Sequence, residues 1–204
     1  MNRVYNRSQG LTYLRLSLEN INQSQGVSKA LNQLRQYKDR LTSLHLAGCC
    51  IDSCLSQFSD TFLRDEFPAL EEFFAESDGG YLNGNRPIIS MVSAPRQQQQ
   101  PSLKALGLNI RFSNAQHWTK VIRAIDLSAL EELHFNDGSS YGFTQEDLGI
   151  LVDHIAGSEA PSLPLRVLNL NGITLDKSAS TYNLFVRLRT KVPEIKIKTI
   201  RVGI

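Results

Sequence analysis

The chain has 204 residues, 41% of them hydrophobic, and a formal net charge of +2. This hydrophobic content suffices to bury a core, so a folded chain is expected rather than a disordered one. The charge is too small for a general nucleic-acid binder, and no apolar run is long enough to span a membrane. The three cysteines, Cys49, Cys50 and Cys54, are odd in number and lie close together. They do not suggest a disulfide framework, which favours a reducing compartment, cytoplasmic or nuclear.

A short apolar frame recurs along the chain. Each copy has apolar residues at positions 1, 4 and 6, and the residues between them vary. Six copies begin at Leu11, Leu41, Leu70, Leu103, Leu130 and Leu165, and a weaker seventh begins at Val192. Consecutive copies start 27 to 35 residues apart. Repetition at this period predicts an array of similar units, each containing one strand.

The stretches between the copies change to a helical period. Two apolar stripes show it most clearly: Trp118, Val121, Ile122 and Ile125, then Leu148, Leu151, Val152 and Ile155. The second stripe follows a capping box that begins at Thr144, and it ends before Gly157. Each unit is therefore predicted to be a strand followed by a helix.

Stacked units of this kind must bend. Parallel strands lie about 4.8 Å apart, whereas packed helices need about 10 Å. The sequence therefore predicts an α/β solenoid of about seven irregular units. It would be a curved horseshoe with parallel strands on the concave face and helices on the convex face, and residues 1–204 would form a single domain.

Two parts of the chain depart from this pattern. Residues 81–102 contain three prolines and a run of glutamines, with no helical stripe, and are predicted to form a long irregular loop. The ten residues before Leu11 are a thin cap for the first unit. Either these residues form a minimal edge of the array, or an N-terminal part of a longer protein is missing, which is the alternative that we expect.

The frames resemble the leucine-rich repeat superfamily, in particular its ribonuclease-inhibitor-like class. The likeness runs from Leu11 to about Val202 and is strongest in the second unit, where Cys49 stands at the buried polar position of the family. The uneven units are also similar to the repeat regions of fungal F-box proteins. These resemblances imply a non-catalytic scaffold that binds a protein on its concave face, as a substrate-recognition module of a ubiquitin ligase. The alternative that they imply is a regulator of an enzyme, similar to nuclease inhibitors or GTPase-activating repeat proteins.

Strand pleating directs positions 3, 5 and 7 of each frame outward, onto the predicted binding face. The candidate partner-binding residues taken from this set are Arg15, His45, Glu72, Phe74, Glu76, Asn109, Glu132, His134, Asn136, Asn169 and Asn171.

Three features of this set stay open at the level of sequence. Phe74 is either an exposed aromatic anchor or is turned inward in place of Ala75. Asn109, Asn136 and Asn171 form either a hydrogen-bonding row for a ligand or ordinary polar solvation of the sheet. His45 and His134 lie three strands apart, too far for one metal ion, and are interpreted as exposed polar residues.

The charge of the predicted binding face indicates the kind of partner. Five glutamates, Glu71, Glu72, Glu76, Glu131 and Glu132, crowd two units of the predicted face, and Lys104 and Arg166 interrupt them. This predicts a protein partner with a basic surface.

The sequence contains no nucleophile elbow, phosphate-binding loop or zinc-protease motif. We therefore expect no enzyme activity, no cofactor and no metal, and neither nucleic acid nor membrane as a partner.

Overall fold

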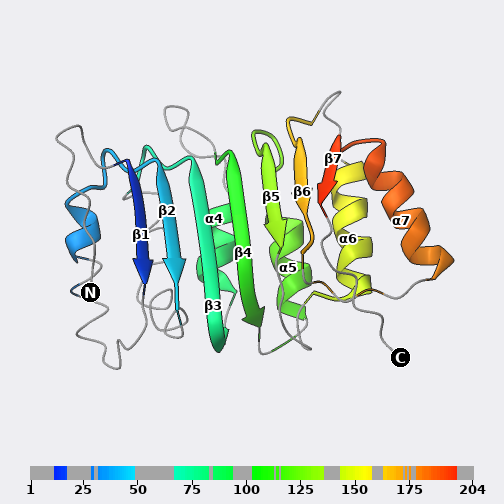
Figure 1. Cartoon of the computed structure of the whole chain (residues 1–204), viewed down its shortest axis with the longest axis horizontal. Coiled ribbons are helices and arrows are strands. Elements are labelled where there is room, and N and C mark those ends of the chain that lie inside the picture. Colours follow the sequence, from blue (N-terminus) through cyan, green and yellow to red (C-terminus); the bar gives the residue numbers. More distant parts are fainter. Residues whose placement is uncertain are drawn as a thin grey trace.

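Seven strands form one parallel sheet whose spatial order follows the chain (Figure 1). They are β1 (Tyr13–Ser17), β2 (Ser43–Ala47), β3 (Glu72–Leu82), β4 (Ala105–Phe112), β5 (Glu132–Phe135), β6 (Val167–Asn169) and β7 (Glu194–Lys196). Each apolar frame supplies one strand, the weak seventh copy included. The prediction of parallel strands in sequence order is confirmed.

The computed structural model describes residues 12–17, 29, 32–48, 67–82, 85–93, 103–112, 114, 116–135, 143–157, 163–171, 173, 175 and 178–196. Within these ranges, no helix combines the length and the apolar character that crossing a membrane requires.

The units stack in register, so position 3 of each frame lies beside position 3 of the next. One backbone contact repeats at most of these steps. The carbonyl oxygen at position 2 accepts two N–H groups of the following unit, as at Thr12, Thr42, Glu71, Lys104 and Glu131. The array is therefore regular at the strands even though the units differ in length.

The described chain has four helices longer than one turn. They lie on one side of the sheet (Figure 1). They are α4 (Arg86–Val92), α5 (Gln116–Ala124), α6 (Gln145–Ala156) and α7 (Ala179–Arg189), and each packs against the next in the chain. Residues 32–35 are also helical. The α/β layering follows the prediction.

The core lies between the sheet and the helices. The residues at positions 4 and 6 of β2 to β5 are at most 1% exposed, and so are Trp118, Val121 and Ile122 of α5. Trp118 stands edge-on to the rings of Phe112 and Phe135, with centroids 5.0 and 5.4 Å away. Edge-to-face packing of this kind stabilises aromatic pairs beyond their buried area.

The capping box predicted at the start of α6 is present. Thr144 accepts a hydrogen bond from the backbone N–H of Asp147, and the Asp147 carboxylate accepts one from the backbone N–H of Thr144. The Asp147 side chain is buried, which raises the pKa of its carboxyl, while its hydrogen bonds from Thr144 and Thr119 oppose the rise.

The prediction of an irregular loop over residues 81–102 is wrong in its first half. Strand β3 extends to Leu82, and helix α4 begins at Arg86 with a proline in its first turn, where the missing N–H group costs nothing. Ile88 and Val92, one helical turn apart, are buried in the core. Residues 94–102, with the glutamine run, lie outside the described part.

Candidate interaction surface on the open face of the sheet

The face of the sheet opposite the described helices carries the outward side chains, and it is called the open face here. Its middle is one row of residues in register, one from each strand: Arg15, His45, Phe74, Gly107, His134, Asn169 and Lys196. We call this set the central row. Because the strands are parallel and in register, residues far apart in the sequence become neighbours.

Phe74 lies on the open face, between two histidines. Its ring centroid is 5.9 Å from that of His45 and 5.7 Å from that of His134, and both ring pairs are tilted. The ring is half-buried, whereas Phe73 and Ala75 on either side are buried in the core. The alternative in which Phe74 turns inward in place of Ala75 is therefore wrong.

Phe74 reaches His134 because the residue between them is glycine. A Cβ atom at Gly107 would lie only 2.2 Å from Cδ1 and 2.7 Å from Cε1 of Phe74. No side chain can occupy position 107 while the ring stays where it is. The absence of a side chain at Gly107 therefore lets the Phe74 ring lie over strand β4.

The histidines are not free polar residues, contrary to the sequence interpretation. Their side chains are only 18% and 22% exposed, for His45 and His134 respectively. Phe74 joins them into one aromatic group, which we call the His-Phe-His triad. At the level of sequence the two histidines are three strands apart, and their common contact with Phe74 is visible only in the structure.

One acid fixes the first histidine of the triad. Glu76 lies 3.3 Å from Nε2 of His45 and 3.6 Å from Arg15, and its other oxygen accepts a hydrogen bond of 3.3 Å from Asn109. Burial, followed by the positive charge of Arg15, lowers the pKa of His45 below its ordinary value, while Glu76 opposes the shift.

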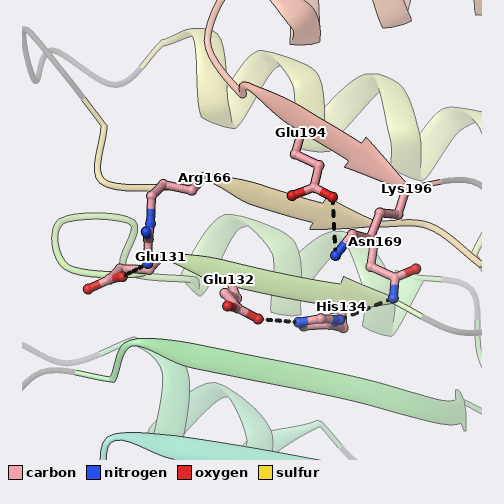
Figure 2. A network of polar contacts seen from close by, with 7 residues as sticks. All are labelled: Glu131, Glu132, His134, Arg166, Asn169, Glu194 and Lys196. Atoms are coloured by element: carbon pink, nitrogen blue, oxygen red, sulfur yellow. Dashed lines mark hydrogen bonds and ion pairs between the residues drawn. The ribbon is translucent and has the colours of Figure 1, made fainter.

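The second histidine is held from both sides (Figure 2). Nε2 of His134 lies 3.1 Å from Glu132, and Nδ1 lies 3.2 Å from the amide nitrogen of Asn169. The Asn169 oxygen accepts the backbone N–H of Asn171, which fixes the orientation of the amide. The amide nitrogen therefore donates to Nδ1, so the His134 proton is on Nε2 and is donated to Glu132.

Two of the glutamates are neutralised by their neighbours. Glu71 pairs with Lys104 at 2.9 Å, and Glu131 pairs with Arg166. The hydrogen bond that Lys104 donates to Glu71, together with the negative charge of Glu71, raises the pKa of Lys104. The acidic character of the face therefore comes from Glu72 and Glu132, because Glu76 is shared with Arg15 and His45.

The structure brings most of the predicted residues together on one face, while the proposed asparagine row stays a prediction because its middle member is not described. Asn109 binds Glu76, and Asn171 follows strand β6 in a turn. Asn136 lies outside the described residues, as do the three cysteines. Gly107 is not among the site residues predicted from the sequence. Its position could have indicated it, because a glycine at an outward strand position often marks the close approach of another group.

Neither comparison with known proteins finds a relative. No protein-family model matches the chain, and no curated protein is significantly similar to it. Within the described ranges, no three or more His, Cys, Asp or Glu side chains are grouped as they would be to bind a metal ion.

Proposed function

We propose that this chain is a leucine-rich-repeat-like solenoid that acts as a non-catalytic scaffold, and that it binds a protein with a basic surface on its open face. The observation that carries the proposal is the His-Phe-His triad. A partly exposed aromatic ring at the centre of a sheet face, held by its neighbours, has the composition of a binding anchor. The ring is positioned before any partner arrives, which lowers the entropy cost of association.

Charge supports the choice of partner. Within the described part of the chain, Glu72 forms no ion pair, and the only ion-pair partner of Glu132 is His134. The cations near them are already paired, Lys104 with Glu71 and Arg166 with Glu131. A basic partner would therefore meet carboxylates that the chain itself does not neutralise.

Affinity capture tests this proposal with a matched pair of variants. Phe74→Ala removes the ring from the open face, whereas Tyr182→Ala removes an aromatic ring that is 70% exposed on α7. We expect the partner captured by the parent chain to be lost with Phe74→Ala and kept with Tyr182→Ala. Loss with Tyr182→Ala alone would place binding on the helix side. Ubiquitination of the captured protein in the presence of the chain would support the more specific role of a ubiquitin-ligase receptor.

A further inference from the structure

Helix α7 is the last of the described helices that cover the sheet (Figure 1). Each of α4, α5 and α6 has the next helix packed against one flank, and no described helix follows α7 to do the same. An ion pair of 2.8 Å between Asp153 of α6 and Arg187 of α7 identifies the flank of α7 that faces α6. The opposite flank is the place where a further helix of the array would lie.

That opposite flank carries a stripe of three residues. Tyr182, Val186 and Arg189 are spaced four and three residues apart, so they follow one another along the helix. With about 3.6 residues per turn, the stripe points away from Arg187 and therefore away from α6. We call these three residues the outer flank of α7.

The outer flank is apolar and open to solvent. Tyr182 is 70% exposed and Val186 is 47% exposed, and in the described part of the chain the only other exposed large hydrophobic residue is Tyr13. Tyr13 lies on β1, at the far end of the sheet. Large apolar side chains that are exposed side by side, with charged residues around them, are typical of a protein-binding surface.

The outer flank also has cations without acids. Arg189 and Lys191 are exposed at the C-terminal end of α7, and neither forms an ion pair within the described ranges. On the inner flank, by contrast, α6 supplies Asp153 to Arg187. A two-fold contact between two copies of the chain would bring the same cations together, because it joins the same surface of both molecules. Charge therefore favours a different, acidic neighbour.

We propose that the outer flank of α7 binds an acidic amphipathic helix of a partner protein. Its apolar side chains pack on Tyr182 and Val186, and one of its carboxylates pairs with Arg189 as Asp153 pairs with Arg187. This surface lies on the helix side of the sheet, so the inference does not rest on the function proposed for the open face.

The experiment is an NMR titration of the full chain with a designed helical peptide, in which glutamates border one stripe of leucines. The control peptide has lysines in place of the glutamates. We expect the glutamate peptide to shift the backbone amides of Tyr182, Val186 and Arg189, and the lysine peptide to leave them unchanged. Tyr182→Ala should weaken binding of the glutamate peptide about tenfold, as the loss of an aromatic contact does.

A matched pair of charge reversals tests the ion pair. Arg189→Glu should weaken binding of the glutamate peptide about tenfold, because it replaces an attraction by a repulsion. It should also let the lysine peptide bind. Arg123→Glu reverses another exposed arginine in the last turn of a helix, α5, and should change neither titration. Phe74→Ala should also have no effect, which separates this flank from the open face.

Four results would overturn the proposal. They are equal shifts with the two peptides, equal weakening by the two arginine reversals, shifts of the α7 amides that follow protein concentration without peptide, and shifts produced only by vesicles of phosphatidylserine and phosphatidylcholine. The third result would show that a second copy covers the flank, and the fourth that a membrane surface does.

Discussion

At the residue scale, neighbouring side chains of one strand face opposite sides. Leu133 is fully buried, while His134 is on the open face. We expect Leu133→Ala to lower the free energy of unfolding by about 2–5 kcal/mol. His134→Ala removes two hydrogen bonds, each with a usual net value of about 0.5–1.5 kcal/mol, and should cost less than Leu133→Ala. Urea denaturation of the two variants measures the difference, and equal losses would mean that the inward and outward positions are displaced by one residue.

The surroundings of His45 predict how stability depends on pH. Its folded pKa lies below the ordinary value of 6.5, so the folded state binds this proton more weakly than the unfolded chain does. The free energy of unfolding should therefore fall as the pH decreases from 6.5 through the lower folded pKa, with no contribution from His45 above that range. His45→Asn should remove this part of the acid sensitivity. Urea midpoints measured at several pH values would contradict it if parent and variant changed in parallel.

At the scale of single elements, the cap of α6 is a local stabilising device. Thr144→Ala removes the oxygen that accepts the N–H group of Asp147 and should lower the free energy of unfolding by about 1 kcal/mol. Thr144→Ser keeps a hydroxyl at the same place and should retain nearly all of the parent stability. Equal losses for the two variants would show that the threonine methyl group, rather than the cap, is important.

Elements whose signals are local could be predicted from the sequence. The strands follow from the apolar frames, and α6 follows from Thr144 and its apolar stripe. Helix α4 was missed because Pro87 suggested a loop, although a proline in a first turn is compatible with a helix. Its stripe consists of Ile88, Ile89 and Val92, and these span little more than one turn, too short for a periodicity to stand out.

Contacts between units could not be predicted in the same way. The register itself follows from the frames, because each frame position lies beside the same position of the next unit. The conformation of each side chain does not follow from the register, and it decides that Phe74 lies over Gly107 and that Lys104 reaches Glu71. The sequence therefore indicated the face, while the structure was needed to show the triad and to find where charge remains unpaired.

At the scale of the whole molecule, charge and the aromatic anchor should affect different rate constants. Reversing both Glu72 and Glu132 to lysine should slow association with the partner and reduce its dependence on salt, because charge complementarity acts mainly on the encounter. Dissociation should change less. Association kinetics at two salt concentrations measure this effect. The same double reversal at Glu146 and Asp153, on the helix side, is the control and should leave association unchanged.

Carboxyl labelling of the chain, free and in complex with its partner, tests the use of the open face most directly. Water-soluble carbodiimide modifies accessible carboxylates, and mass spectrometry measures each site. Glu72 and Glu132 are accessible on the open face, while Glu146 and Asp153 are accessible on the helices. We predict that the partner protects Glu72 and Glu132 and leaves Glu146 and Asp153 labelled as in the free chain. Protection of Glu146 and Asp153, with Glu72 and Glu132 still fully labelled, would contradict binding on the open face.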